Sequence, residues 1–366
     1  MTAPSGSAPA SSPVLLVLGA GESDYRICAL QQVASLHPVV LVSSETPDWA
    51  QPHLVGEILV DLADGQAVAT AVKDYAAEHN VIGVLTYIPH HVELTARLAQ
   101  DLGLPGNAPG AVAACRDKAL SLRMLAGHAV PGALIEESLD GLEIGVEAVV
   151  LGPGDIQIIA VTRKRLGPGP AFEEMGHCVD ANDVLLREPA VSDVITHALE
   201  ALGITLGVVH ADMRLTDSGP RLIEVNACLG GDLIPLLVQL ATGINLVRVA
   251  AALASGAVPD LTPSRAEAAA IGILYPYTSG RVEELNLSSP DEPWLEIFEP
   301  WLERLVWTQQ IGNWVSAPPA SSIADRVAHW VVTGKDTAMC DERLLRTAET
   351  VVARIAAAPH TATCAR

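Results

Sequence analysis

The stretch HADMRLTDSGPRLIEVNACLGG, residues 210–231, decides the fold of the middle of this chain. Two segments of alternating apolar and polar residues, 208–215 and 221–225, flank the turn at 217–220, which is Asp-Ser-Gly-Pro. Such alternation on both sides of these turn residues is typical of two antiparallel strands. The sequence therefore predicts a β-hairpin here.

Polar side chains recur at every second position of this hairpin. Asp212 and Arg214 share one face of the first strand, and Glu224 and Asn226 share one face of the second. If the hairpin aligns the two faces, Asp212, Glu224 and Asn226 form a set of hard oxygen ligands that suits Mg²⁺. A hairpin with polar residues on its solvent face has the same spacing, so spacing alone leaves both interpretations open.

The segment before the hairpin alternates short apolar runs with helix-like stretches. The run Val14–Leu18 precedes Gly19-Ala20-Gly21, a pattern typical of a buried strand that ends in a glycine turn. Further strands are predicted at 39–42, 58–60 and 81–86, and helices at 25–36, 66–79 and 92–102. This alternation predicts a parallel sheet covered on both faces. We expect a Rossmann-like domain at 14–108, preceded by a flexible tail at 1–13.

Residues 109–258 are predicted to form an α+β domain. Besides the hairpin, strands are expected at 134–137, 143–150 and 156–161, and helices at 116–127, 192–203, 233–241 and 246–254. After residue 258 the composition shifts, with most tryptophans between Trp294 and Trp330 and then a predicted helix at 341–356. Residues 259–366 are therefore expected to form a small C-terminal α+β domain. The predicted fold class is α/β, with three domains.

The composition narrows the classes of function. The formal net charge of −21 argues against a nucleic-acid surface, which needs clustered Lys and Arg. Hydrophobic residues make up 49% of the chain, which allows a sizeable core, and no apolar run reaches the length of a membrane span. The six cysteines show no zinc spacing and are expected to be reduced thiols in the cytoplasm. We expect no nucleic-acid partner and no membrane.

The hairpin resembles the C-terminal lobe of the ATP-grasp superfamily, in which an acid, a turn and a Glu-x-Asn strand hold magnesium between ATP phosphates. The following LGGDLIPLLVQLATGINL, residues 229–246, is similar to the L-amino-acid ligase branch, whose members join a carboxylate to an amine. The resemblance implies that Asp212, Glu224 and Asn226 are metal ligands. It also implies ATP and Mg²⁺ as cofactors, with Mn²⁺ as an alternative ion.

Two earlier segments match the family's pattern in the expected order. Cys115-Arg116-Asp117-Lys118 resembles the Asp-Lys at the start of the ATP-grasp domain, which implies that Lys118 contacts an ATP phosphate. The segment LIEESLDGLE, residues 134–143, resembles the hinge that borders the adenine. By this resemblance Glu136 and Leu139 supply hinge contacts, and Glu143 lies near the ribose.

A basic segment follows in the same order. Thr162-Arg163-Lys164-Arg165 and then FEEMGH, residues 172–177, resemble the segment that closes over the substrate. The chain has four lysines, so we favour a functional role for Lys164 over an exposed basic turn. For His177 the alternative is an ordinary loop histidine. Lys164 and Arg214 are the predicted catalytic residues.

Two departures from the family's pattern bear on activity. The family places a subdomain with a second phosphate lysine and a glycine-rich loop between the Lys118 helix and the hinge, whereas here residues 130–133 lead directly to the hinge. The ATP-grasp domain is therefore expected to be shortened. Two residues after Asn226 the family commonly has an arginine that holds acyl-phosphate oxygens, and this chain has Cys228. Cysteine cannot make a bidentate charge-assisted contact, and an arginine of the hairpin is the candidate to compensate.

The resemblance implies an ATP-dependent carboxylate–amine ligase that forms an amide or peptide bond through an acyl phosphate. Its substrates would be a small-molecule carboxylate and an amine, expected to be amino acids. The departures support an alternative, a catalytically impaired homologue that binds nucleotide or a partner protein. A remote alternative is a dinucleotide-dependent oxidoreductase, based on Gly19-x-Gly21 and on Glu45 after the next strand, although Asp24 replaces the third glycine. Dimers are common among similar proteins, so a homodimer is one expected assembly.

Overall fold

The computed structural model describes residues 12–127, 140–169, 173–287 and 299–357. They form two compact units that alternate along the chain. Unit 1 comprises the residues up to Ala160, Val184–Gly231 and Ile244–Thr262, and unit 2 comprises Val161–Asp183, Asp232–Gly243 and the residues from Pro263 onward. The expected domain boundaries after residues 13, 108 and 258 stay predictions.

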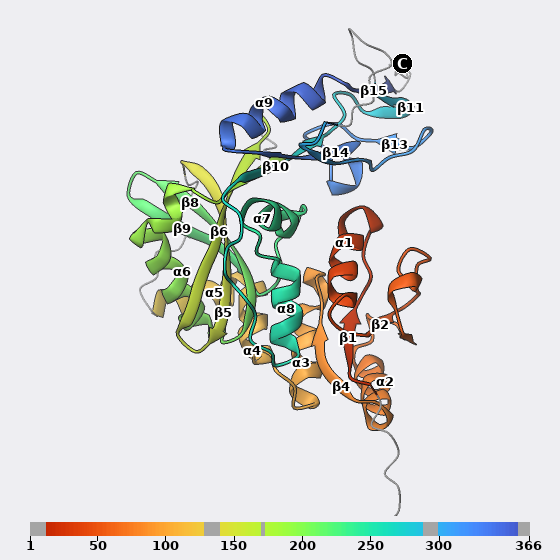
Figure 1. The fold of residues 1–366 in the computed structure, drawn as a ribbon, viewed down its shortest axis with the longest axis vertical. Helices are drawn as coiled ribbons and strands as arrows, with labels where there is room; N and C mark the ends of the chain where they lie inside the picture. Colours follow the sequence, from red (N-terminus) through yellow and green to blue (C-terminus); the bar gives the residue numbers. More distant parts are fainter. Residues whose placement is uncertain (1–11, 128–139, 170–172, 288–298, 358–366) are drawn as a thin grey trace, which may run out of the picture. The chain divides into compact units, whose positions relative to one another are not determined.

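Unit 1 begins with a parallel four-stranded sheet in the order β3-β2-β1-β4 (Figure 1). Its strands are β1 (Val14–Leu18), β2 (Val39–Ser43), β3 (Gly56–Leu59) and β4 (Val81–Leu85). Every residue of β1 and β2 is buried. Strands covered on both faces consist of continuous runs of valine and leucine, which is the pattern that predicted this sheet. The parallel sheet is confirmed.

Helices and short 3₁₀ turns accompany these strands. They are α1 (Ser23–Ala34), α2 (Gly65–Glu78), α3 (Val92–Asp101), η1 (Gln51–His53) and η2 (Pro89–His91). The Asp64 side chain caps α2 by accepting bonds from the backbone nitrogens of Gln66 and Ala67. Gly19, directly after β1, has a φ of +74°, and a Cβ there would lie 2.7 Å from Ile88 Cδ1. The turn after the first strand therefore needs glycine.

The remainder of unit 1 holds an antiparallel sheet in which β8 lies between β5 and β9. Its strands are β5 (Leu142–Gly152), β8 (Gly207–Thr216) and β9 (Gly219–Asn226). The accompanying helical elements are α4 (Pro109–Arg116), α5 (Lys118–Gly127), α6 (Pro189–Leu202), α8 (Leu246–Ala254) and η3 (Val184–Arg187). Strands β8 and β9 form the expected hairpin, with a shift of register between Asp212 and Met213.

Unit 2 contains an antiparallel sheet ordered β12-β14-β10-β7-β6 and a three-stranded sheet ordered β13-β11-β15. The strands are β6 (Asp155–Leu166), which begins in unit 1, β7 (Glu174–Asp180), β10 (Ala268–Leu274), β11 (Gly280–Leu287), β12 (Leu302–Trp307), β13 (Trp314–Val315), β14 (Ala328–Gly334) and β15 (Val351–Ala357). The helical elements are α7 (Ile234–Thr242), α9 (Thr337–Ala348) and η4 (Ile323–Asp325). Helix α9 packs on the larger sheet through Cys340 and Leu344, which join Trp330 of β14 in one core cluster.

The predicted helix at 341–356 is wrong in its second half. Helix α9 ends at Ala348, and β15 follows and pairs antiparallel with β11. Val351, Val352 and Ile355 are β-branched, which favours a strand, and pairing with β11 overrides the helix propensity of the alanines in this segment. The strand predicted at 134–137 lies outside the described residues.

The α/β fold class is confirmed. Unit 1 combines a parallel sheet and its helices with an antiparallel sheet, and unit 2 adds antiparallel sheets with α7 and α9. Within the described ranges no single helix is long and apolar enough to cross a membrane, and α7 and α8 reach that length and hydropathy only when taken together.

Candidate active site

The polar face predicted on the hairpin is present in unit 1. Asp212 on β8 lies opposite Glu224 on β9, and His210 lies opposite Asn226. Asn226 Nδ2 donates to Glu224 Oε1 at 3.0 Å. Asp212 is 8% exposed, whereas Glu224 and Asn226 are partly exposed. The hairpin therefore aligns the three predicted metal ligands on neighbouring strands.

A cleft of about 150 Å³ opens beside this face, and we call it the polar cleft. It is lined by Pro89, Val92, Val112, Cys115, Arg116, Lys118, Glu224, Asn226, Ala227 and Cys228. Arg116 ends α4 and Lys118 begins α5, so two cations line the same space as Glu224 and Asn226. Cations next to hard oxygen donors suit an anion that is held together with a divalent metal ion.

His210 lies between two carboxylates on this face. Its Nδ1 donates to Glu147 Oε1 at 2.5 Å, and its Nε2 lies 3.2 Å from Asp212 Oδ1. Burial alone would lower the pKa of His210, but the charges and bonds of Glu147 and Asp212 outweigh burial and raise the pKa well above its ordinary value. The imidazole is therefore protonated and offsets the charge of two buried carboxylates.

Sequence reasoning missed Glu147 and His210 as site residues. A signal for Glu147 exists, because it is the single charged residue in the run from Ile144 to Val150. A charged residue inside an otherwise apolar strand predicts a buried partner, since an unpaired buried charge is costly. His210 lies two residues before Asp212 and so shares its face. Neither signal says that the two residues contact each other.

Arg214 and Glu143, both predicted site residues, form an ion pair between β8 and β5. Arg214 also donates to the Gly141 carbonyl oxygen at 3.3 Å. Both side chains are partly buried, at 24% and 15% exposed. Arg214, one of the two hairpin arginines (with Arg221) that are candidates to compensate for the cysteine at position 228, thus has a carboxylate partner on β5.

Cys228 contributes a buried thiol to the wall of the polar cleft. Burial raises its pKa to about 11. The thiol is therefore neutral near neutral pH and supplies no charge to an anion in the cleft. Position 228, where the family commonly has an arginine, therefore adds no positive charge to the cleft.

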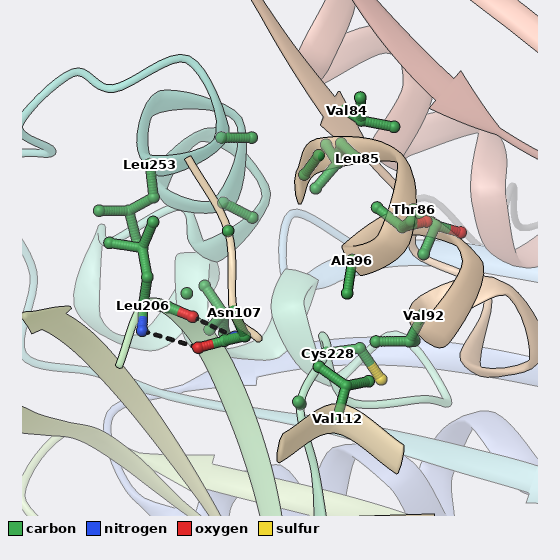
Figure 2. A pocket seen from close by; sticks show the side chains of 18 of the residues that line it. Val84, Leu85, Thr86, Val92, Ala96, Asn107, Val112, Leu206, Cys228 and Leu253 are labelled. Atoms are coloured by element: carbon green, nitrogen blue, oxygen red, sulfur yellow. Dashed lines mark hydrogen bonds between the residues drawn. The ribbon is translucent and has the colours of Figure 1, made fainter. Parts of the chain in front are cut away.

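A second cavity of unit 1, of about 100 Å³, is lined mainly by apolar side chains, and we call it the apolar cavity (Figure 2). The residues that it shares with the polar cleft are Val92, Val112, Ala227 and Cys228. Figure 2 shows Asn107 bonded to Leu206: Asn107 Nδ2 donates to the Leu206 carbonyl oxygen at 2.6 Å, and Oδ1 accepts from the Leu206 nitrogen at 3.0 Å. Because the Asn107 side-chain amide is already hydrogen-bonded to backbone groups, the cavity offers a ligand mostly apolar contacts.

Unit 2 carries a separate charged cluster around Asp232. Arg326 is 2% exposed and donates to both Asp232 carboxylate oxygens, at 2.6 and 2.9 Å. Its Nε donates to Tyr275 Oη at 2.9 Å. His177 Nε2 donates to Asp232 Oδ2 at 3.2 Å and lies 3.9 Å from Glu174 Oε2. Burial alone would raise the pKa of Asp232, but the bonds from His177 and Arg326 outweigh it and hold the pKa well below its usual range.

Lys164 belongs to this cluster, because its Nζ lies 3.0 Å from Glu174 Oε1 and its side chain is 6% exposed. Lys164 lies on β6 and the buried His177 on β7, so the alternatives of an exposed basic turn and a loop histidine are wrong. Glu174, His177 and Asp232 each place a ligand atom within 4.8 Å of the others. Since Arg326 bonds to both Asp232 oxygens, we interpret the cluster as an ion-pair network rather than a metal centre.

The backbone at Asp232 is strained. Asp232 and Leu233 have φ angles of +46° and +60°, in a region that residues other than glycine rarely adopt. Such strain persists only where surrounding contacts hold it, and it concentrates at functional sites. The bonds from Arg326 and His177 supply those contacts.

The predicted hinge residues Glu136 and Leu139 lie outside the described residues. Of the hinge segment, the structure describes only residues 140–143. The adenine contacts expected from Glu136 and Leu139 therefore stay predictions.

The fold and the polar cleft define an α/β protein with a cleft in unit 1 that is lined by cationic and oxygen-donor side chains. Residues 37–106 match the ATP-grasp N-terminal domain, and residues 108–235 match the ATP-grasp domain. The second match includes Lys118 and the whole β8–β9 hairpin. The chain therefore belongs to the ATP-grasp superfamily.

Three proteins illustrate what the chain is similar to. The crystal structure of L-amino acid ligase from Bacillus licheniformis matches with a TM-score of 0.79 at 18% identity, covering 95% of this chain and 100% of that one. Human carnosine synthase 1 is 24% identical over 279 residues, which is 73% of this chain and 30% of that protein. An uncharacterized protein of Sinorhizobium fredii, y4rH, is 27% identical over 269 residues, which is 65% of this chain and 54% of that protein. The chain thus matches about half of one curated relative and about a third of the other.

ATP-grasp enzymes generally use ATP with Mg²⁺, and the residues of the polar face fit such an ion. Asp212 and Glu224 supply carboxylate oxygens and Asn226 an amide oxygen, which are the donor types that Mg²⁺ prefers. Like charges directly opposite each other destabilise a sheet. A bound cation would offset the repulsion between Asp212 and Glu224.

Proposed function

We propose that this protein is an ATP-dependent carboxylate–amine ligase. The observation that carries the proposal is that Lys118, Glu224 and Asn226 line one cleft, with Asp212 opposite Glu224. This set supplies a cation for an ATP phosphate and hard oxygens for Mg²⁺. Membership of the ATP-grasp superfamily and the fold shared with an L-amino acid ligase support it.

The proposed reaction has two steps. A carboxylate oxygen of the first substrate attacks the γ-phosphorus of ATP, the bond from this phosphorus to the β–γ bridging oxygen breaks, and ADP leaves. The amine nitrogen of the second substrate then attacks the carbonyl carbon of the acyl phosphate. The bond from carbon to the phosphate oxygen breaks, the nitrogen loses a proton, and an amide and inorganic phosphate remain.

The side chains of the polar cleft have separate roles in this proposal. Lys118 contacts an ATP phosphate, and Asp212, Glu224 and Asn226 hold Mg²⁺, which when bound offsets negative charge on the phosphates. Each residue acts by binding and orienting ATP. Phosphoryl transfer depends mainly on such positioning and electrostatic stabilisation.

Arg214 and Lys164 stay proposed as catalytic residues. Each forms an ion pair with a carboxylate, Arg214 with Glu143 and Lys164 with Glu174. Each would therefore have to share or exchange this partner to contact a phosphate or a substrate. The pairing also keeps the buried cations compensated before substrates bind.

The proposed substrates are amino acids, one of which has an apolar side chain. The apolar cavity adjoins the polar cleft through Val92, Val112, Ala227 and Cys228. We propose that it receives the apolar part of one substrate while the phosphates occupy the polar cleft. Pockets of this kind bind mainly by hydrophobic contact, and a few polar groups fix the orientation.

The test is release of ADP and inorganic phosphate by the full chain with Mg-ATP and pairs of amino acids. The proposal expects release that needs both amino acids and the divalent ion, together with an amide product seen by mass spectrometry. No release above background with any pair would contradict it. Calorimetry with Mg-ATP then shows whether nucleotide binding remains.

A second candidate is a homologue that binds nucleotide without turnover, and the neutral, buried Cys228 favours it. This candidate expects Mg-ATP binding without phosphate release. Substitution of Cys228 by arginine restores the residue that is common in the family, and two adjoining cavities offer room for its side chain. Phosphate release that appears only in C228R would support this candidate. The oxidoreductase alternative is not retained, because the chain belongs to the ATP-grasp superfamily.

A further inference from the structure

Glu147 and His210 form a buried pair behind the carboxylates of the hairpin. Glu147 is 0% exposed, and its Oε1 accepts the 2.5 Å bond from His210 Nδ1. Its Oε2 has no hydrogen-bond partner among the described residues. Removing two ions from water costs several kcal/mol each, and apolar replacements of such pairs are often neutral or stabilising. Stability alone therefore does not account for this pair.

The pair is connected to Asp212. Glu147 and His210 are register partners on β5 and β8, and Asp212 lies two residues further along β8. The other ring nitrogen, Nε2, lies 3.2 Å from Asp212 Oδ1. One imidazole thus contacts a carboxylate at each nitrogen, and these two contacts fix the orientation of the ring.

We propose that Glu147 and His210 are positioning residues that hold the Asp212 carboxylate in the orientation needed to bind a divalent cation. Glu147 fixes the His210 ring, and His210 fixes Asp212. The inference rests on the proposed metal role of Asp212. Loss of a partner of this kind behind a metal ligand typically lowers metal affinity by about 10–100-fold.

The glycine loop after β9 packs directly on the pair. A Cβ at Gly230 would lie 3.1 Å from His210 Nδ1 and 3.3 Å from each carboxylate oxygen of Glu147. A Cβ at the next residue, Gly231, would meet nothing within 4 Å. G230A therefore presses on the pair, whereas G231A adds the same methyl group without contact. The two substitutions form a matched test and control.

The two nitrogens of His210 can be replaced one at a time. The amide nitrogen of asparagine takes roughly the place of Nδ1 and keeps a donor for Glu147. The amide nitrogen of glutamine takes roughly the place of Nε2 and keeps a donor for Asp212. H210N thus breaks the contact to the proposed metal ligand, and H210Q breaks the contact to Glu147.

The experiment measures the affinity of the full chain for ATP with Mg²⁺ and for ATP with EDTA, by calorimetry. Mn²⁺ binding without nucleotide is followed by electron paramagnetic resonance. We expect H210N to lose about 10–100-fold in metal affinity while H210Q keeps more of it. Binding of metal-free ATP should not change in either variant. G230A should also lower metal affinity, because its methyl group displaces the His210 ring as a whole, and G231A should resemble the unsubstituted chain.

If Glu147 and His210 only stabilised the fold, the two histidine variants would rank in the opposite order. The short bond to Glu147 would then matter most, so H210N would be tolerated better than H210Q and only the thermal midpoint would change. That ranking, or unchanged metal affinity in both variants, overturns the proposal. If the histidine variants do not fold, equal metal affinity in G230A and G231A overturns it. Metal binding that weakens as expected in a chain that catalyses no ligation would contradict the proposed function and leave the positioning role supported.

Discussion

Asp212 and Glu224 lie directly opposite each other on β8 and β9, immediately before the register of the hairpin shifts. Like charges in this arrangement are unfavourable in a sheet. Register shifts of this kind are common next to active sites, where they re-aim side chains. Two carboxylates kept in apposition beside a cleft are therefore expected where a cation binds.

Neutralising Asp212 or Glu224 should lower activity without lowering the stability of the fold to the same degree. We expect D212N and E224Q to lower Mg-dependent ADP release roughly 100-fold, the scale for loss of one preorganised electrostatic contact. In the absence of divalent ions E224Q should raise the free energy of unfolding by about 0.5 kcal/mol, because it removes the cross-strand repulsion, whereas D212N also loses the contact to protonated His210 and should show no such gain. Kinetic assays and urea denaturation with EDTA measure the two effects.

Asp217 provides the control for this prediction. It lies in the turn of the same hairpin and is exposed. D217N removes the same charge without touching the polar face, so ADP release should remain as in the unsubstituted chain. Equal losses in D217N and D212N would show that the effect comes from net charge and not from a metal site.

Lys118 should affect binding of ATP more than the stability of the fold. It is exposed at the start of α5 and lines the polar cleft. K118M removes a charge-assisted contact to phosphate, and we expect the KM for ATP to rise roughly 10-fold, about 1.4 kcal/mol, with an unchanged thermal midpoint. K335M is the control, because the Lys335 side chain is 73% exposed and lies outside the cleft-lining residues. Identical kinetics in K118M and K335M would show that Lys118 does not contact ATP.

The sequence predicts the shared polar face of the hairpin well for a physical reason. Residues 208–225 combine alternation with a turn, and both signals are local, so the face shared by Asp212, Glu224 and Asn226 follows from strand geometry. The parallel sheet of unit 1 is predicted for the same reason, because continuous apolar runs mark buried strands.

The parts that sequence reasoning missed depend on distant pairings. Glu147 and His210 are 63 residues apart in sequence, and Asp232 and Arg326 are 94 apart. The sequence alone does not show which partner each of these residues meets, and only the folded chain does. The error at β15 has the same origin, since its strand character depends on pairing with β11.

Filling the apolar cavity should change the choice of substrate. Ala96 of α3 lines the cavity and is 6% exposed. If the cavity receives an apolar side chain, A96L should lower kcat/KM for leucine-sized substrates by about 10–100-fold and leave glycine and alanine unaffected. The measurement compares kcat/KM across amino acids of increasing size.

The exposed Ala77 of α2 provides the control, and A77L should not alter selectivity. An unaltered size preference in A96L, together with a higher thermal midpoint, would mean that the substitution only fills a void in the core. The cavity would then have no role in substrate binding.

His329 should make unit 2 sensitive to acid. It lies on β14 and is 0% exposed, and burial together with the charges of Arg304 and Arg326 lowers its pKa to about 4. In the unfolded chain the pKa of histidine is about 6.5. Between these two values the unfolded chain binds a proton that the folded chain does not, so stability falls as the pH drops from about 6.5 towards 4.

The variant H329Q removes this titration and keeps a polar side chain. The free energy of unfolding should fall between about pH 7.5 and about pH 5, and this fall should be about 2 kcal/mol larger in the unsubstituted chain than in H329Q. The comparison does not depend on how stable the variant is at the higher pH. Urea denaturation at both pH values measures the difference. H197Q, in which an exposed histidine of α6 is replaced, should keep the pH dependence of the unsubstituted chain. Parallel losses in H329Q and the unsubstituted chain would mean that His329 keeps its ordinary pKa in the folded protein.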